Sequence, residues 1–392
     1  MTLLSKEKLF YIDAYQKSFD ANVISCENTS GGNYIAVLNK TAFYPEGGGQ
    51  PADVGKIGVA DVFDVFEKDG KIYHKINMPL AVGGVVHGEI DFLRRMSNMQ
   101  NHSGEHIVSG IIKSRLGYDN VGFHMGSEFI TIDISGELTG PEVEEIELLA
   151  NEAVYQNLDI EILFPNELEY KGMSCRSKKE LTGEIRVVQI AGVDNCACCG
   201  IHVAKTGEIG IIKLISHQRY KGGSRISMLC GRRALDDYSS KNKSVYKISG
   251  LLSAKPNEVA AAAENMLTEN AALKYKVVEQ KLRIFEYIAN SIDPCERICI
   301  FEENLTPTEL KQLCQNLCER AKFALVLSSE NAGPPYRYAL GSLTGDIVPV
   351  GQRLNEMFNG RGGGKGIMQG SVSGNRGEIE KFFGEVELPG IL

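Results

Sequence analysis

Two histidines in the first third of the chain have the spacing of metal ligands. His102 and His106 are four residues apart in the sequence His102-Ser103-Gly104-Glu105-His106. Residues four apart lie on one face of a helix, so both imidazoles can point at the same position. The apolar residues that follow recur at helical spacing and include Ile107, Ile111 and Ile112. The pair therefore predicts half of a metal site on a helix.

A second stretch, almost a hundred residues later, supplies a matching half. Cys198 and His202 are also four residues apart, in the sequence Cys198-Cys199-Gly200-Ile201-His202. Together with the first pair they would form a tetrahedral shell of nitrogen and sulfur, which is the geometry that zinc prefers. We predict one zinc ion held by all four residues. Cys196 and Cys199 are rival thiols, and the sequence does not exclude them as ligands.

Glu105 lies between the two histidines of the first pair. On a helix its carboxylate points away from the line of the ligands but stays near it, so Glu105 could act as a general base. It could equally be a solvated residue on the helix surface. The sequence leaves both interpretations open.

The periodicity of apolar residues divides the chain into four predicted parts. Residues 1–90 contain short β-rich runs separated by glycine turns, as in a small barrel. Residues 91–240 mix helical and strand patterns, and residues 241–292 are dominated by one long helix. Residues 293–392 have the pattern of a small α/β domain. We predict an α+β multidomain fold, with an N-terminal β-barrel, an α+β zinc-binding domain, a long helical linker and a C-terminal α/β domain.

The long helix has apolar residues at alternating intervals of four and three, as in a coiled-coil seam with two polar interruptions. The seam residues are Val259, Ala263, Met266, Asn270, Leu273, Val277, Gln280 and Ile284. Such a helix packs against its own chain, pairs with a second copy, or separates two domains. The sequence alone does not choose among these.

The charge pattern suggests where a nucleic acid would bind. The net charge of −8 argues against indiscriminate binding, but it leaves room for a local basic face. Seven basic residues and one acid lie between positions 205 and 233, directly after the second half of the metal site. The cations are Lys205, Lys213, Arg219, Lys221, Arg225, Arg232 and Arg233. This basic strip is either a solvated surface or a phosphate-binding strip.

Two glycine-rich segments stand apart from the rest. Residues 43–53 contain Gly47, Gly48 and Gly49 followed by Gln50, and form either a flexible turn or a backbone wall beside a ligand. The glycine-rich pattern of residues 360–366 predicts a loop. With Arg361 and Lys365, this loop could contact a nucleic-acid backbone. No Lys-Ser or Lys-Thr pair ends that segment, so a nucleoside triphosphate site is not expected.

Charged residues are spread through the first twenty positions, so we expect no signal peptide. No uninterrupted apolar run approaches the ~18 residues of a membrane span. Ten cysteines in such a chain are expected to be reduced thiols, some of them metal ligands. We predict a cytoplasmic protein without a membrane partner.

With these residues in view, the chain resembles the stand-alone alanyl-tRNA editing proteins, the AlaX family, in its long form. It also resembles the editing and C-terminal regions of alanyl-tRNA synthetases. Residues 9–15 resemble the opening strand of the family, and residues 43–53 match its glycine-glycine-glutamine signature. The two zinc motifs occur in order, although the family's Cys-Gly-Gly-Thr-His reads Cys198-Cys199-Gly200-Ile201-His202 here. Residues 360–366 resemble the family's glycine-rich C-terminal domain.

The resemblance implies hydrolysis of the ester in tRNA(Ala) mischarged with serine or glycine. The implied zinc ligands are His102, His106, Cys198 and His202, and Glu105 and Ser103 are the implied catalytic residues. Ser103 keeps the hydroxyl of the family's threonine, which could recognise a seryl side chain. The predicted substrate pocket comprises Gly48, Gly49, Gln50 and Ile201. The predicted tRNA contacts are Lys221, Arg225, Arg219, Arg361 and Lys365, and we expect two chains to pair through the long helix or the C-terminal domain.

Two other functions fit parts of the pattern. His102-Ser103-Gly104-Glu105-His106 satisfies the H-x-x-E-H signature of one class of zinc peptidase, in which the glutamate is the base. A closed shell of four protein ligands is also typical of structural zinc in a non-catalytic RNA-binding module. Whether zinc in an editing enzyme would activate water or orient the substrate is likewise left open by the sequence.

Overall fold

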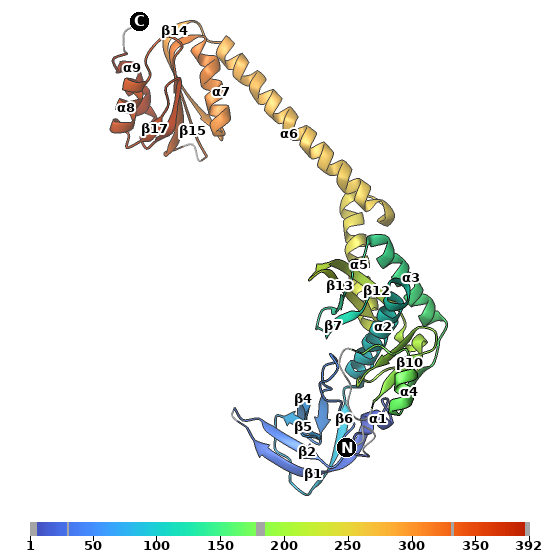
Figure 1. Cartoon of the computed structure of the whole chain (residues 1–392). Coiled ribbons are helices and arrows are strands. Elements are labelled where there is room, and N and C mark those ends of the chain that lie inside the picture. Colours follow the sequence, from blue (N-terminus) through green and yellow to red (C-terminus); the bar gives the residue numbers. More distant parts are fainter. Residues whose placement is uncertain (1–5, 30, 178–184, 331–332, 389–392) are drawn as a thin grey trace. The chain divides into compact units, whose positions relative to one another are not determined.

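The computed structural model describes residues 6–29, 31–177, 185–330 and 333–388 (Figure 1). The chain divides into two compact units, residues 1–247 and 248–392. The expected α+β multidomain class and the barrel are confirmed, while the finer division into four parts stays a prediction. Among the described helices, none combines the length and apolar character needed to cross a membrane.

The first unit begins with a closed barrel of six strands in the order β1-β2-β5-β4-β3-β6. The strands are β1 (Ser18–Asn28), β2 (Tyr34–Leu38), β3 (Gly55–Ile57), β4 (Ala60–Lys68), β5 (Lys71–Ile76) and β6 (Val85–Ile90). Ile72, His74 and Ile76 of β5 are buried and their neighbours are not, as expected for a strand with one face toward a core.

Residues 9–15 do not form the strand that the family resemblance implies. Leu9–Ile12 is the short helix α1. The helical turn places Phe10 in the core, and the hydroxyl of Tyr11 donates to the backbone carbonyl of Cys199. Tyr15 extends the same contact, since its hydroxyl donates to Glu208 and accepts from the backbone N–H of Ala204. The segment thus packs the start of the chain against the second metal-ligand stretch.

Helix α2 (Phe92–Leu116) carries the first pair of histidines. Its first turn is capped by Asp91, whose side chain accepts from Arg94 N–H, and it ends at Gly117, which has a φ of 74°. Almost every residue from 98 to 112 is buried, so the helix is covered on all sides.

The elements around α2 form two small sheets and a helix. One sheet has the order β12-β13-β8-β7 and the other β11-β10-β9. Their bounds are β7 (Asn120–Met125), β8 (Ile130–Ile134), β9 (Ile160–Leu163), β10 (Val187–Ile190), β11 (Asp194–Ala197), β12 (Ile212–Tyr220) and β13 (Gly223–Cys230). Helix α3 (Gly140–Tyr155) packs on α2, and α4 (Glu167–Gly172) and η1 (Thr206–Ile209) are short.

A fully buried ion pair joins α2 to the glycine-rich segment of the barrel. The Nε of Arg95 lies 3.0 and 2.9 Å from the two carboxylate oxygens of Asp53, and both side chains are 0 % exposed. Arg95 also donates to the backbone carbonyls of Ala14 and Ala42, and Asp53 accepts the N–H of Tyr44. Because every charge here is paired, residues 42–53 are fixed against the helix.

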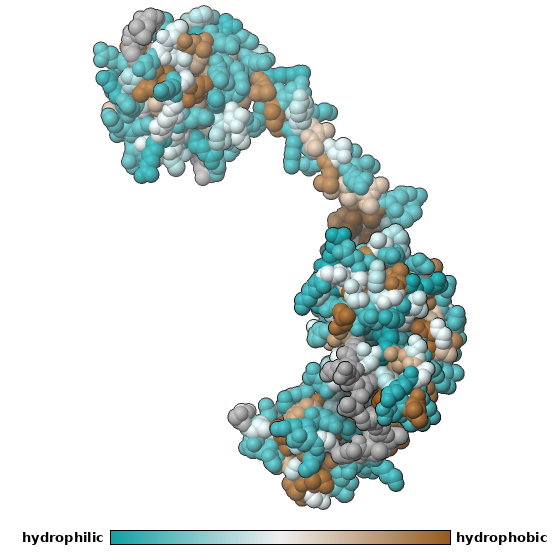
Figure 2. Space-filling model, viewed as in Figure 1, coloured by the Kyte–Doolittle hydropathy of each residue, from teal (hydrophilic) through white to brown (hydrophobic). Residues whose placement is uncertain are grey.

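Helix α5 (Gly231–Leu252) crosses from the first unit into the second and is followed by η2 (Pro256–Glu258) and the long helix α6 (Val259–Asn290). The last turns of α6 bury Phe285 and Ala289 against α7. Nearer the start of α6, the seam residues Met266, Leu273 and Val277 are 52 %, 60 % and 55 % exposed. Figure 2 shows apolar side chains in brown on the surface of this helix.

The second unit contains a five-stranded sheet in the order β14-β15-β16-β18-β17. Its elements are β14 (Cys295–Glu303), α7 (Pro307–Cys318), β15 (Ala321–Ser329), β16 (Tyr336–Gly341), α8 (Val348–Met357), β17 (Arg361–Gly363), β18 (Ile367–Val372) and α9 (Arg376–Glu385). β14 and β15 are parallel and α7 connects them, as in a βαβ unit, whereas the other pairs are antiparallel.

The glycine-rich segment 360–366 is not the continuous loop that the sequence suggests. Arg361–Gly363 is an edge strand paired with β18, in register with Ser371, Gly370 and Gln369. Gly362 permits this pairing, since a Cβ there would lie 2.3 Å from the hydroxyl of Tyr338. The backbone groups of this strand are therefore partly used in the sheet.

Candidate metal centre

The structure brings the four predicted ligands together. One nitrogen of each of His102, His106 and His202 and the sulfur of Cys198 all lie within 4.8 Å of one another. The ring centroid of His202 lies 4.6 Å from those of both other histidines. Helix α2 supplies two members and the loop after β11 supplies the other two, so the cluster joins segments that are distant in the sequence.

Each histidine of the cluster uses its Nδ1 in a hydrogen bond. Nδ1 of His102 lies 2.8 Å from Oε1 of Gln50, and Nδ1 of His202 lies 3.2 Å from Oγ of Ser103. Nδ1 of His106 lies 2.9 Å from a carboxylate oxygen of Asp194. These contacts leave the three Nε2 atoms for a common ligand, an arrangement typical of histidines that bind a metal through Nε2.

The chemical state of the sulfur atoms distinguishes Cys198 from its neighbours. Burial acts to raise the pKa of the Cys198 thiol, but the surrounding histidines, His102 above all, hold it well below its usual value. Burial raises the pKa values of Cys196 and Cys199 above the ordinary value. A metal binds the thiolate form, so Cys198 is the best sulfur ligand of the three.

The cluster fits a metal ion by two further observations. Nε2 of His202 is buried and has no hydrogen-bond partner within the described residues. Burial lowers the pKa of His202 to about 3, so its imidazole is neutral, as a ligand must be. Burial also lowers the pKa of His106, but Asp194 and Cys198 outweigh it and raise the value to about 10. An arriving cation would therefore displace a proton from His106.

Glu105 is not a solvated helix residue, because only 2 % of it is exposed. Its Oε1 accepts hydrogen bonds from Ser109 Oγ, at 2.7 Å, and from the side-chain amide of Asn120. Its Oε2 lies 4.0 Å from Nε2 of His106. One oxygen is thus fixed by the protein and the other lies beside the cluster.

Ser103 is completely buried, and its hydroxyl contacts residues of the second ligand stretch. Oγ accepts the backbone N–H of Val203 at 3.2 Å and lies 3.2 Å from Nδ1 of His202. This geometry places Ser103 behind the imidazole of His202, where it orients that ring.

The predicted pocket residues lie on one side of His102. Gln50 is fully buried, and its Oε1 also accepts the N–H of Ile201 at 3.4 Å, while its Nε2 is buried without a partner within the described residues. Gly200 must be a glycine, because a Cβ there would lie 2.1 Å from the ring of His102. Gly48 and Gly49 are exposed, and a Cβ on Gly48 would lie 3.8 Å from the backbone nitrogen of Gly200. The side chain of Ile201 belongs to the core.

The four residues of the cluster differ in burial. The three histidines are buried and Cys198 is half-buried, whereas the neighbouring Cys199 is exposed. Phe123 stacks on His102 with a centroid distance of 5.1 Å.

Sequence reasoning missed several residues that hold the second ligand stretch. Tyr11 and Tyr44 donate to the carbonyl of Cys199, at 2.8 and 3.4 Å, and Arg186 donates to the carbonyl of Cys198 at 2.7 Å. Arg186 also lies over the ring of Tyr11. Tyr11 and Tyr44 lie in segments that resemble the family, but nothing in their spacing links them to Cys199, and Arg186 has no motif around it.

Most of the basic strip is paired with acids. Arg225 makes a bidentate contact with Asp133, at 2.6 and 2.8 Å, and Arg219 lies 3.0 Å from Glu137. Three more of its cations have carboxylate partners: Lys205 with Asp159, Lys213 with Glu147, and Arg232 with Asp236. Lys221 is exposed and lies over the ring of Tyr220, with no ion pair among the described residues. The free positive charge is smaller than the sequence suggests.

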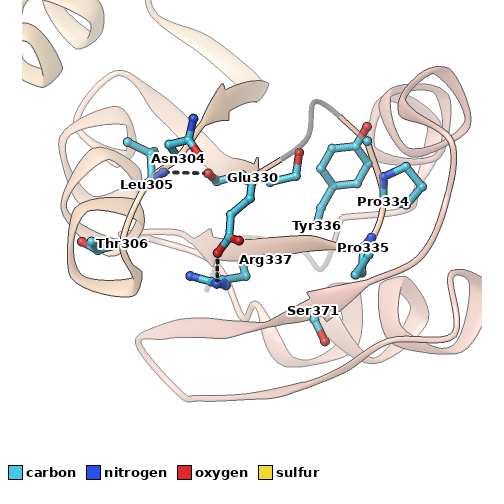
Figure 3. A pocket seen from close by; sticks show the side chains of 12 residues that line it. Asn304, Leu305, Thr306, Glu330, Pro334, Pro335, Tyr336, Arg337 and Ser371 are labelled. Carbon is cyan, nitrogen blue, oxygen red and sulfur yellow. Dashed lines mark hydrogen bonds and ion pairs between the residues drawn. The ribbon is translucent and has the colours of Figure 1, made fainter.

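Arg361 and Lys365 belong to the second unit and are exposed. Arg361 and Arg337 both pair with Ser371 of β18, from opposite sides, so these three residues point to one face of the sheet. Beside them, a cavity of about 770 Å³ lies where β14 and β15 end. Figure 3 shows Arg337 and Glu330 paired in this cavity, with Ser371 on the neighbouring strand.

The comparisons with known proteins agree with the cluster. Residues 185–230 match the model described as the threonyl and alanyl tRNA synthetase second additional domain, and residues 6–94 match tRNA synthetases class II (A). The alanyl-tRNA editing protein AlaX-L of Pyrococcus horikoshii is 32 % identical, over 72 % of this chain and 72 % of its own length. The chain belongs to the alanyl-tRNA editing family.

Alanine–tRNA ligases are also similar to this family member. The ligase of Methanobrevibacter smithii is 30 % identical over 91 % of this chain, and that of Ignicoccus hospitalis is 32 % identical over 92 %. The chain spans only 43 % and 40 % of the lengths of those two proteins.

Substituting each thiol in turn tests which sulfur holds the metal. We expect C198S to lose the zinc that the unchanged protein retains after dialysis, because serine offers no thiolate at neutral pH. C196S and C199S should keep it. The measurement is zinc per chain by atomic spectroscopy, with circular dichroism as a control for folding. Retention of zinc by C198S together with its loss from C196S or C199S would identify a different ligand.

Proposed function

We propose that the protein hydrolyses the ester that joins a wrong amino acid to tRNA(Ala), with zinc held by His102, His106, Cys198 and His202. The observation that carries the proposal is the convergence of these four side chains within 4.8 Å in a member of the alanyl-tRNA editing family. The relative AlaX-L is named for the editing of alanyl-tRNA. We propose serine and glycine as the wrong amino acids, and the cytoplasm, where tRNA is charged, as the place of action.

The chemistry divides between the metal and the side chains around it. Zinc can polarise an ester carbonyl, orient the aminoacyl group or lower the pKa of water. Glu105 is the candidate general base, because Ser109 and Asn120 fix one of its oxygens and the other lies 4.0 Å from Nε2 of His106. A water molecule placed between this oxygen and the ester would lose its proton to the carboxylate.

The selectivity for serine would come from polar groups beside His102. Nε2 of Gln50 is a buried donor without a partner within the described residues, so a substrate oxygen that accepted from it would satisfy it. Alanine and glycine have no side-chain oxygen and would leave polar groups of the pocket unpaired, so this contact favours serine over both. Ser103 would contribute by fixing His202, since its hydroxyl is held by Val203 and His202.

A second function also fits the shell of four residues. Structural zinc sites are closed by four protein ligands, so the same cluster could stabilise an RNA-binding protein that has no catalytic activity. The buried and fixed carboxylate of Glu105 favours the editing function. The peptidase alternative has less support, because Cys198 and His202 complete the cluster in place of the carboxylate ligand expected from a later helix.

The tRNA would contact exposed cations in both units. In the first unit Lys221 is available without breaking an ion pair, whereas Arg219 and Arg225 would have to exchange a carboxylate for a phosphate. In the second unit Arg361 and Lys365 would take part. Arg361 and Arg337 lie two strands apart on one face, or about 10 Å, so they could bind successive phosphates.

The activity itself can be tested by deacylation of Ser-, Gly- and Ala-tRNA(Ala), with and without a chelator. We expect hydrolysis of the first two, no hydrolysis of Ala-tRNA(Ala), and loss of activity with the chelator. E105Q should lower kcat roughly 10²- to 10⁴-fold if Glu105 is the base, with zinc content unchanged. A protein that binds zinc but cleaves none of the three substrates would favour the non-catalytic function.

Charge reversal tests the proposed tRNA contacts. We expect K221E, and separately R361E with K365E, to weaken tRNA binding and to flatten its salt dependence. The slope of log affinity against log salt should fall by about 0.7 to 0.9 for each phosphate that the variant no longer binds. Binding is measured by filter retention at several salt concentrations. K71E, on the exposed β4–β5 hairpin of the barrel, is the control and should leave the slope unchanged.

We also propose that two chains pair along α6. Its seam residues Met266, Leu273 and Val277 are more than half exposed, and Asn270 within the seam is the kind of residue that fixes the register of a coiled coil.

Pairing along α6 predicts a dimer in sedimentation equilibrium. L273D with V277D should give a monomer, because charges within an apolar seam are costly to bury. T268D lies on the opposite face of the helix and should remain dimeric. A dimer in both variants would point to an interface elsewhere, such as the C-terminal sheet.

A further inference from the structure

We infer that Asp194, held by Arg176, is a positioning residue for the metal ligand His106 and sets how tightly the centre holds its ion. The inference rests on the metal centre of the proposed function. Asp194 begins β11, four residues before Cys198, and Arg176 lies in the segment after α4. Neither residue belongs to the two ligand motifs.

The contact between Asp194 and His106 fixes both the proton and the orientation of the imidazole. Oδ2 of Asp194 lies 2.9 Å from Nδ1 of His106, and each side chain is 2 % exposed. A carboxylate can only accept, so Nδ1 carries a hydrogen, and Nε2 is the nitrogen whose lone pair a metal would bind. The ring cannot turn without breaking a buried charged hydrogen bond.

Arg176 fixes the carboxylate in turn. Its Nε lies 2.7 Å from Oδ1 of Asp194 and its Nη2 lies 2.7 Å from Oδ2, which is a bidentate contact with defined geometry. Its backbone is also anchored, since its N–H donates to the carbonyl of Asn195 and its own carbonyl accepts from Ala197. The guanidinium compensates a negative charge that would otherwise be buried unpaired.

The three histidines of the centre differ in what their Nδ1 atoms contact. His102 contacts the amide of Gln50 and His202 contacts the hydroxyl of Ser103, both of which are neutral. His106 alone among the three contacts a carboxylate. A carboxylate partner increases the electron density that an imidazole offers to a metal more than a neutral partner does. Asp194 therefore makes His106 the strongest of the three imidazole ligands.

Asp194 could in principle bind the metal itself, because its carboxylate, His106 and Cys196 also lie within 4.8 Å of one another. The contacts of Arg176 argue against this. A cation bound to Asp194 would have to displace the guanidinium, which contacts both carboxylate oxygens. Arg176 thus keeps Asp194 in its role behind His106.

The test compares the zinc affinity of three variants of the full chain by competition with a chromophoric chelator. D194A removes both the charge and the acceptor, and we expect about 10- to 100-fold weaker zinc binding. D194N keeps the shape and an oxygen acceptor, so its affinity should lie between those of D194A and the unchanged protein. D133N is the matched control: it breaks another bidentate pair, with Arg225, that contacts none of the four ligands, and its zinc affinity should be unchanged.

The visible spectrum of the Co²⁺-loaded proteins is a second measurement, because it reports the ligand geometry rather than folding. It should be the same for D133N and the unchanged protein and altered for D194A. Equal zinc affinity of D194A and D133N would overturn the inference, and if D194A does not fold, equal affinity of D194N and D133N overturns it. If the unchanged protein binds no zinc, the proposed metal centre fails, which is a different result.

Discussion

The buried ion pair between Arg95 and Asp53 is the interaction on which the arrangement of the site depends. It joins the helix that carries His102 and His106 to the barrel segment that carries Gln50. Both side chains are inaccessible to solvent, so removing one partner would leave an unpaired buried charge, at a cost of about 3 to 5 kcal/mol. Because this pair fixes the barrel segment against α2, the side-chain amide of Gln50 stays within hydrogen-bond distance of Nδ1 of His102.

The ligand cluster is held from several sides, and each support comes from a different element. The barrel provides Gln50, helix α2 provides Ser103, and β11 provides Asp194. Tyr11 and Arg186 hold the carbonyls of the loop with Cys198. The protein's own hydrogen bonds therefore orient the three imidazoles, which lowers the free energy that metal binding would spend on ordering them.

The cluster of four side chains could be predicted from sequence because two pairs at a spacing of four residues need only local structure. The same reasoning could not find Asp194 or Arg176, since their contacts depend on how β11 and the segment after α4 pack on α2. It also could not show how many cations of the basic strip are paired with acids. Arg225 pairs with Asp133 because β13 lies beside β8, and the register of two strands 92 residues apart in sequence has no local signal.

Burial was the property that periodicity described least well. The predicted helix was correct, but its hydrophobic spacing gave no sign that Glu105 lies in the interior, because the amide of Asn120 and the hydroxyl of Ser109 satisfy it there. The barrel and the βαβ unit were easier, because alternating and continuous apolar runs are direct consequences of one-sided and two-sided burial.

The lowered pKa of the Cys198 thiol has a consequence for the stability of the centre in air. A thiolate is the form of cysteine that peroxides convert to sulfenic and then to sulfinic acid wherever they reach it. A bound cation would occupy the lone pair that such oxidants attack. Metal binding and the redox state of the surroundings are therefore linked through the sulfur of Cys198. Loss of the ion would leave open to oxidation the thiolate that is needed to bind an ion again.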